Sequence, residues 1–275
     1  MANQVTTAEA KPQTPMQRFN SAISSESMKD YLSSMLGDKR DSFVNNVVAL
    51  VSNSTALQAC KPMSVIYAAM KATALDLPLD PALGFAYVIP YGNASGAAAQ
   101  FQIGKAGLIQ LAMRSGQVSK LNAGTCYEGD IVDEDFLTGD ITVKKGEKRN
   151  KKKIIGFFAY LETTTFKKTL YMTKEEMDAH GTRFSKTFKS GPWQTDYEAM
   201  AHKTILKKIL KWAPMSVEMR DAVKADQAEI TQDGKYVYVD RPEDVDEQNF
   251  EENAQAVNER REAMRASGEM ADTLL

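Results

Sequence analysis

The pattern of apolar and polar positions in residues 1–225 predicts an α+β fold. The segments 41–53 and 63–77 carry apolar residues at the spacing of core helices, and LPLDPALG (77–84) then breaks this pattern with two prolines and a glycine. Strand-like runs follow at 85–92, 98–103, 121–128, 140–145, 154–163 and 167–173. Because strands and helices do not alternate regularly, we expect an antiparallel β-sheet of hairpins packed with helices, and not a doubly wound fold.

The segment TDYEAMAHKTILKKILKWAP (195–214) predicts a helix with two different faces. Thr195 and Glu198 have the spacing of a capping box at its start, and Pro214 ends it. The apolar face gathers Tyr197, Ala201, Ile205, Ile209 and Trp212. The opposite face carries Lys203, Lys207 and Lys211, one helical turn apart. Such a row is either a solvated face or a ridge that binds phosphates, and the scarcity of acids in this segment favours the ridge.

The stretch QFQIGKAGLIQLAMRSGQV (100–118) predicts a short strand that turns sharply into a helix. Gly104 and Gly107 remove side-chain bulk where a backbone turns tightly or another group approaches closely. The free N–H groups at the start of the helix, with the positive charge of Lys105 beside them, suit a phosphate. The alternative is an ordinary strand-to-helix turn with a surface lysine.

The formal net charge of −2 hides a separation of charge along the chain. Residues 1–225 hold 29 basic and 22 acidic residues, whereas residues 226–275 hold 5 basic and 14 acidic residues. The last segment has few large apolar residues after Val245, so it cannot bury enough surface to offset the entropy of ordering. We therefore expect a flexible N-terminal arm (1–27), a folded, net basic domain (28–225) and an acidic, largely flexible tail (226–275).

Composition argues against several functional classes. No run approaches the roughly 18 consecutive apolar residues of a membrane span, and the start of the chain is polar, so we expect a soluble, cytoplasmic protein. Cys60, Cys126, His180 and His202 are the only cysteines and histidines, and their spacing matches no zinc-ligand set. The phosphate-binding pattern G-x-x-x-x-G-K-[ST] does not occur, which argues against ATP-driven strand exchange. We expect no metal, no cofactor and no catalytic residue.

Basic residues cluster from 144 to 211, where 17 Lys or Arg stand against 7 Asp or Glu. The run KKGEKRNKKK (144–153) alone holds seven basic residues and one acidic residue. By itself such a run is often a solvated hairpin tip or a disordered loop. Here Phe184, Phe188 and Trp193 are interleaved with the cations. Cations that replace condensed counterions, with aromatic rings available for base stacking, are typical of a protein that binds single-stranded DNA.

Two long segments resemble the signature regions of the RecT/Red beta family of phage single-strand annealing proteins. The first is LPLDPALGFAYVIPYGN, continuing through QFQIGKAGLIQLAMRSGQV, and the second is GPWQTDYEAMAHKTILKKILKWAPMSVEM. The similarity spans about residues 28–225. The matching positions are Gly104, Gly107, Arg114, Ser115 and Gly116 in the first segment and Gly191, Pro192, Trp193, Met200, Lys203, Thr204, Lys207, Lys208 and Lys211 in the second.

This resemblance implies an ATP-independent recombinase that coats single-stranded DNA, assembles into homo-oligomeric rings or helical filaments, and pairs complementary strands. It also implies a phage exonuclease as partner, and the acidic tail could dock that exonuclease or a host single-strand-binding protein. Such a protein would contact the DNA backbone and leave the base edges free to pair. With the charge pattern, the resemblance predicts these DNA-binding residues: Lys105, Arg114, Lys120, Lys144, Lys145, Arg149, Arg183, Lys186, Lys189, Trp193, Lys203, Lys207, Lys208 and Lys211.

Two other functions stay open at the level of sequence. A passive coating protein would bind single-stranded DNA without annealing it. A magnesium-dependent nuclease would use the acids of YEGDIVDEDF, which are Glu128, Asp130, Asp133, Glu134 and Asp135. The Glu-x-Lys pair of a familiar nuclease pattern is missing there, and most of these acids have the pattern of a polar turn between strands.

Overall fold

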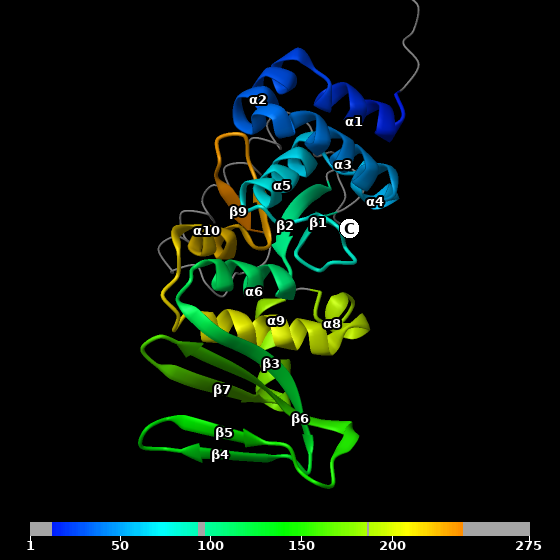
Figure 1. Cartoon of the computed structure of the whole chain (residues 1–275). Coiled ribbons are helices and arrows are strands. Elements are labelled where there is room, and N and C mark those ends of the chain that lie inside the picture. The colour runs from blue at the N-terminus through cyan, green and yellow to red at the C-terminus, as the bar shows by residue number, and fades with distance from the viewer. Residues whose placement is uncertain (1–12, 93–96, 186, 239–275) are drawn as a thin grey trace, which may run out of the picture.

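The computed structural model describes residues 13–92, 97–185 and 187–238, which form an elongated body with helices at one end and a β-hairpin at the other (Figure 1). In chain order, its helical segments are α1 Pro15–Ile23, α2 Glu26–Leu36, η1 Gly37–Lys39, α3 Arg40–Ser52, α4 Thr55–Gln58, α5 Pro62–Ala74, α6 Lys105–Arg114, α7 Lys174–Phe184, α8 Pro192–Thr195, α9 Tyr197–Leu210 and α10 Val217–Ala225. The strands are β1 Ala86–Tyr91, β2 Ala98–Ile103, β3 Val118–Glu128, β4 Ile131–Asp135, β5 Asp140–Lys144, β6 Asn150–Thr163, β7 Lys167–Thr173, β8 Ala228–Ile230 and β9 Tyr236–Tyr238.

Helices α1 to α5 form the N-terminal end of the body. Helix α1 starts with a capping box, in which Thr14 Oγ1 accepts from Gln17 N (3.2 Å) and Gln17 Oε1 accepts from Thr14 N (2.9 Å). Phe19 and Ile23 on α1 are buried in the core. Residues 15–27 therefore belong to the folded body and not to a flexible arm, so the boundary expected at residue 28 is too late. Residues 1–12 of that arm lie outside the described residues.

The first sheet has the strand order β1-β2-β8-β9 and is antiparallel throughout. Strands β1 and β2 pair as the expected hairpin, from Ala86 opposite Ile103 to Tyr91 opposite Ala98. Strands β8 and β9 come from residues that the charge pattern assigned to the tail, and Phe101 of β2 pairs with Ala228 of β8. The folded body thus extends at least to Tyr238, and the boundary expected at Asp226 is too early. Residues 239–275 lie outside the described residues.

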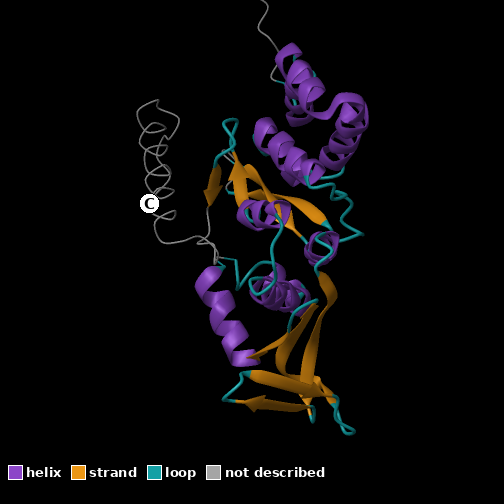
Figure 2. Cartoon of the chain, turned by 60° about the vertical axis from the view of Figure 1, so that its left-hand side comes forward, coloured by secondary structure: helices purple, strands orange, loops and turns teal. Residues whose placement is uncertain are grey.

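The second sheet has the order β3-β6-β7, and β4 and β5 form a separate hairpin between β3 and β6. Helices α6 and α9 pack on each other between the two sheets (Figures 1 and 2). Phe157 of β6 faces α9, where its ring lies 5.7 Å from that of Tyr197 and 5.9 Å from that of His202. The α+β class with antiparallel strands is confirmed, but the strands divide into two main sheets instead of one meander.

Helix α9 begins and ends differently from the sequence prediction. Thr195 is the last residue of α8, and Asp196 is the N-cap of α9, accepting from Ala199 N at 3.4 Å. The capping box predicted from Thr195 and Glu198 is therefore wrong. At the other end, Trp212 lies beyond the helix and is 57% exposed, with the Lys168 ammonium 5.1 Å from its ring centre. Trp212 is thus a surface residue and not part of the apolar core face.

Within residues 13–92, 97–185 and 187–238, no helix is both long and apolar enough to cross a bilayer.

Candidate nucleic-acid interface

The glycines at the start of α6 serve close packing within the protein. A Cβ atom on Gly104 would lie 2.0 Å from the carbonyl oxygen of Gly84, and one on Gly107 would lie 2.2 Å from that of Phe85. Gly104 N also donates to Phe85 O at 2.8 Å. The group that approaches these glycines is therefore the backbone of residues 84–85. The close approach expected at these glycines is thus explained by the protein's own backbone.

Lys105 is the first residue of α6 and joins a polar network between α6, α9 and β3. Its Nζ lies 3.3 Å from His202 Nδ1, and His202 Nε2 lies 2.9 Å from Thr125 Oγ1. The Thr125 hydroxyl donates to Glu198 Oε2 at 2.6 Å. Because lysine donates to Nδ1, this chain of bonds assigns the imidazole proton to Nε2. Burial, followed by the Lys105 charge, lowers the pKa of His202 below its usual value.

Arg114 caps the C-terminal end of α5. Its guanidinium donates to Leu75 O at 2.6 Å and to Asp76 O at 2.8 Å, and it contacts Asp76 Oδ2 at 3.3 Å. These carbonyls end a helix, where positive charge is favourable. Arg114 therefore holds α6 to α5, and any phosphate contact would compete with this role.

In the predicted lysine ridge of α9, Lys203 is buried and Lys207 is partly buried. Lys203 Nζ lies 3.0 Å from Asp226 Oδ1, and Lys207 Nζ lies 3.1 Å from Asp226 Oδ2. Asp226 also accepts from Ile103 N at 3.0 Å, so one carboxylate links α9 to β2. Lys211 is exposed and Lys208 is half-buried. Helix α9 lies between the two sheets, so little of its surface is exposed to solvent. Lys203 and Lys207 therefore face the interior of the protein.

The buried ion pairs shift the ionisation of both partners. Burial alone would raise the pKa of Asp226, but the charges of Lys203 and Lys207 lower it below its usual value. Burial lowers the pKa of Lys203, and the Asp226 charge opposes that effect. Asp226 lies outside the 195–214 segment, so no spacing pattern within the helix could reveal this partner.

Trp193 is a core residue and not a platform for a base. It is 5% exposed, and its ring packs against Phe188 (5.3 Å between ring centres) and Tyr197 (5.7 Å). Stacking on a DNA base requires an accessible ring face, which Trp193 does not present in this structure.

Arg149 also has a structural role in the basic loop. Its guanidinium pairs with Asp130 at 2.7 Å, lies over the ring of Tyr127 at 4.9 Å and donates to Thr125 O at 3.3 Å. The carboxylate of Asp130 also accepts from Tyr127 N and Gly146 N, both at 2.9 Å. Arg149 thereby closes the base of the β4–β5 hairpin.

The same contacts weaken the nuclease alternative. The Asp130 carboxylate is fully used by Arg149 and two backbone N–H groups, and Glu128 pairs with Lys153 at 2.6 Å and with Asn150 at 3.1 Å. Asp133, Glu134 and Asp135 lie on or at the end of β4. Among the residues that the structure describes, no group of three Asp, Glu, His or Cys side chains is placed to hold a metal ion.

The other exposed cations among the predicted DNA-binding residues lie beside the β4–β5 hairpin, on α7 and the segment after it, and on β3. Lys144 and Lys145 are exposed where β5 leaves the hairpin. Arg183, in the last turn of α7, and Lys189, on the segment that joins α7 to α8, are both exposed, and the Arg183 guanidinium lies 5.0 Å from the Phe184 ring centre. Lys120 is exposed on β3 and pairs with Glu162 at 3.2 Å. Lys186 lies outside the described residues.

A small polar cleft of about 40 Å³ adjoins the α7–α8 segment. Its polar lining includes His180, Ser185, Lys203, Thr204, Lys207 and Asp226. Two lysines against one aspartate leave the cleft positively charged, and Arg183 directly precedes Phe184, one of its lining residues. We call the cleft together with Arg183, Lys189, Lys208 and Lys211 the α7–α9 basic surface. With the lining residue Trp193, it brings together seven of the fourteen predicted residues.

Comparison with known proteins decides the family. A profile of the RecT family matches residues 41–240, which is most of the described body. The chain belongs to the RecT family. It is 38% identical over 202 residues to the uncharacterized protein YqaK of Bacillus subtilis (strain 168), covering 73% of this chain and 69% of YqaK. It is 29% identical over 219 residues to Protein RecT of Escherichia coli (strain K12), covering 76% and 80% of the two chains.

The family resemblance predicted from the sequence is thus confirmed. RecT family membership supports a role in phage-type recombination and annealing in general. The matched range includes both sheets, α6 and α9, and it extends past Asp226 through β8 and β9. The family match therefore agrees with the structure that residues 226–238 belong to the body and not to the tail.

Proposed function

We propose that this chain is an ATP-independent single-strand DNA annealing protein, which coats single-stranded DNA and pairs it with a complementary strand within a homo-oligomeric ring or helical filament. The observation that carries this proposal is the RecT family match over residues 41–240. We expect the protein to act in the cytoplasm, where phage DNA recombines. A phage exonuclease that makes the single strands, and a host single-strand-binding protein, are proposed partners.

The mechanism needs positive charge and no chemical step. Two DNA strands repel each other through their phosphates, and cations that neutralise the first strand lower the cost of bringing in the second. The exposed cations that can neutralise phosphates are Lys120, Lys144, Lys145, Arg183, Lys189 and Lys211, and Lys105 and Lys208 are half-buried. Contacts to phosphates leave the base edges available, so base pairing supplies the sequence specificity.

Four other predicted cations make structural contacts within the protein. Arg114, Arg149, Lys203 and Lys207 tie α5, β3, β2 and the hairpin together. Removing them would disturb the fold as well as the charge, so they are poor probes of DNA binding. The exposed residues Arg183 and Lys189 are better probes, because neither is needed to fill the core.

The decisive experiment measures annealing of two complementary oligonucleotides without ATP. We expect the wild-type protein to accelerate annealing, and the double variant Arg183→Ala, Lys189→Ala to bind single-stranded DNA more weakly. The slope of log K against log salt should become less negative by about 0.7 for each lost phosphate contact. The matched control is Arg18→Ala, Lys29→Ala, which removes two exposed charges from α1 and α2.

Each alternative function has its own outcome in this experiment. Binding without faster annealing would identify a passive coating protein. Loss of labelled oligonucleotide only when magnesium is added would identify a nuclease, despite the ion pairs that engage Asp130 and Glu128. If the control variant lowers affinity as much as the Arg183, Lys189 variant, the DNA does not lie on the α7–α9 basic surface.

A further inference from the structure

Trp212 is an exposed aromatic residue just beyond the C-terminal end of α9. It is 57% exposed. Backbone hydrogen bonds hold it in place, because Trp212 N donates to Ile209 O and Ala213 N donates to Leu210 O, both at 3.0 Å. A single exposed apolar side chain needs no explanation by itself. The groups around the ring therefore decide what Trp212 can bind.

Lys168 of β7 holds one side of the Trp212 ring. Its Nζ lies 5.1 Å from the ring centre and donates to Gly139 O, in the turn of the β4–β5 hairpin, at 2.8 Å. The ammonium is thus held at the indole by a second contact, and it stabilises the ring through a cation–π interaction. Because Trp212 is still more than half exposed with Lys168 in place, ring surface stays accessible to another planar group.

The charges on the two sides of Trp212 differ. On the α9 side, Lys211 directly precedes Trp212 and is exposed, and Lys208 lies one turn earlier and is half-buried. Both lysines belong to the α7–α9 basic surface, so Trp212 continues that surface. On the other side is the turn of the β4–β5 hairpin, which lies between Asp135 and Asp140. A nucleic-acid strand at Trp212 therefore has its phosphates beside the α9 lysines and a base over the ring.

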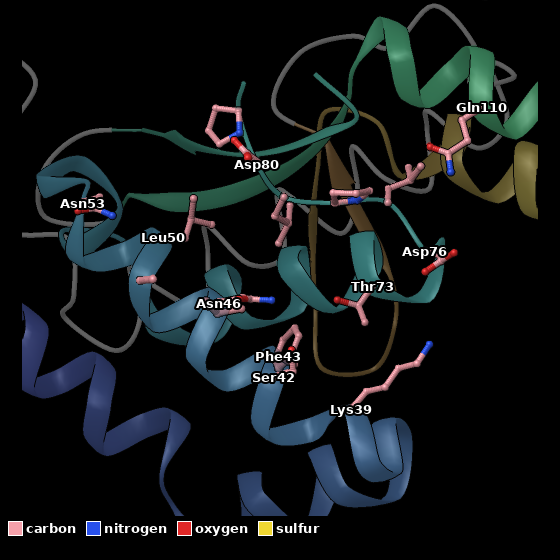
Figure 3. A pocket seen from close by; sticks show the side chains of 16 residues that line it. Lys39, Ser42, Phe43, Asn46, Leu50, Asn53, Thr73, Asp76, Asp80 and Gln110 are labelled. Carbon is pink, nitrogen blue, oxygen red and sulfur yellow. The ribbon is translucent and has the colours of Figure 1, made fainter. Parts of the chain in front are cut away.

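The groove between α3 and residues 76–81 lacks this combination of charge and exposed ring (Figure 3). Its volume is about 1000 Å³, but its charged lining residues are Lys39, Asp76 and Asp80, which leave it net negative. Such a lining repels phosphates. The aromatic residue in the lining, Phe43, is only 5% exposed. The groove therefore does not suit a DNA strand, although it is large.

We propose that the exposed surface of the Trp212 indole is a stacking platform for one base of a single DNA strand that lies along the α7–α9 basic surface. This inference rests on the proposed function, for which it names a base contact. Stacking tolerates any sequence, because every base has a flat aromatic face. It also leaves the base edges free to pair. A base inside a duplex already stacks on both of its neighbours, so Trp212 favours single-stranded over paired DNA.

Tryptophan fluorescence tests the contact directly. Trp212 and Trp193 are the two tryptophans of the chain, and Trp193 is only 5% exposed. A base stacked on an indole quenches its emission, so a short oligothymidylate should quench the emission of the wild-type protein. Trp212→Ala should show no quenching, because its remaining emission comes from the buried Trp193. Quenching that persists in Trp212→Ala overturns the inference.

Binding affinity separates stacking from charge. Trp212→Ala should weaken binding of the oligothymidylate by about 5- to 150-fold, the range for loss of one stacked base, and Trp212→Tyr should recover part of that loss. An abasic oligonucleotide of the same length keeps the phosphates without the bases, so Trp212→Ala and the wild type should bind it equally. The matched control is Met35→Ala, which truncates a side chain of similar exposure (60%) on α2 and should leave both affinities unchanged.

The outcomes distinguish this inference from the proposed function. If the wild-type protein binds no single-stranded DNA, the proposed function fails, and the inference fails with it. If the wild type binds and Trp212→Ala binds the oligothymidylate equally tightly, only the inference fails. An equal loss of affinity for the abasic oligonucleotide also overturns it, because Trp212 then does not act through a base. Emission that changes with protein concentration without DNA, in the wild type but not in Trp212→Ala, would show that a second copy covers the ring, which likewise overturns the inference.

Discussion

Lys203 Nζ lies 3.0 Å from Asp226 Oδ1, and both side chains are buried between α9 and β2. Lys207 shares the same carboxylate at 3.1 Å, and Ile103 N donates to it. Asp226, the first residue of the acidic C-terminal segment, is therefore the electrostatic partner of Lys203 and Lys207. These two lysines have a structural role in linking α9 to β2.

Replacing Asp226→Ala should destabilise the protein by about 3–5 kcal/mol, because it leaves two buried ammonium groups without their counter-charge. Urea unfolding followed by circular dichroism measures this change. The control is Asp233→Ala, which removes an exposed carboxylate from the β8–β9 turn and should change stability little. Equal effects of the two substitutions would mean that Asp226 does not stabilise the lysines.

Two truncations should behave differently. A chain ending at Ala225 lacks Asp226, β8 and β9, and we expect it to lose its cooperative thermal transition. A chain ending at Tyr238 keeps them and removes eleven acidic and four basic residues. We expect this second chain to fold and anneal, and to bind single-stranded DNA more tightly at low salt if the acidic segment competes for the basic surface. Unchanged affinity at low salt would argue against such competition.

Gly104→Ala should lower stability by at least about 1–3 kcal/mol, because its Cβ would overlap a backbone oxygen that cannot move independently of the chain. Lys105→Gln, at the next position, keeps a donor for His202 but removes the charge. It should reduce DNA affinity with a smaller effect on stability. Thermal unfolding and fluorescence anisotropy of a labelled oligonucleotide distinguish the two effects. If Gly104→Ala weakens DNA binding without lowering the melting temperature, the glycine serves the DNA after all.

His202 should make folding stability depend on pH below about 6.5. Burial and Lys105 lower its pKa in the folded state, so the unfolded chain takes up the proton first as the pH falls. The His202 contribution to stability is thus fully present above the unfolded pKa and decreases as the pH falls towards the folded one. Denaturant titrations from pH 5 to pH 7.5 should show a shallower pH dependence for His202→Gln than for the wild type. Parallel curves would show that this histidine does not titrate in that range.

The sequence by itself determined the local elements and the family. Apolar spacing predicted α3, α5 and most strands, because a helix or strand that buries one face must repeat its apolar residues with its own period. The RecT resemblance followed from long contiguous segments, which need no knowledge of contacts. Charge counting also separated a basic body from an acidic end.

The tertiary structure alone decided what each charged and aromatic side chain contacts. A helical projection places Lys203 and Lys207 on a solvated face, yet α9 lies between two sheets and both lysines pair with the buried Asp226. Trp193, which the sequence suggested as a DNA-binding residue, packs in the core against Phe188 and Tyr197. Trp212, which the sequence placed on the apolar face of the helix, lies beyond the end of α9. Periodicity describes only one element's own geometry. Burial and ion pairing depend on which other elements cover it, and residues 226–238 complete that cover from far along the chain.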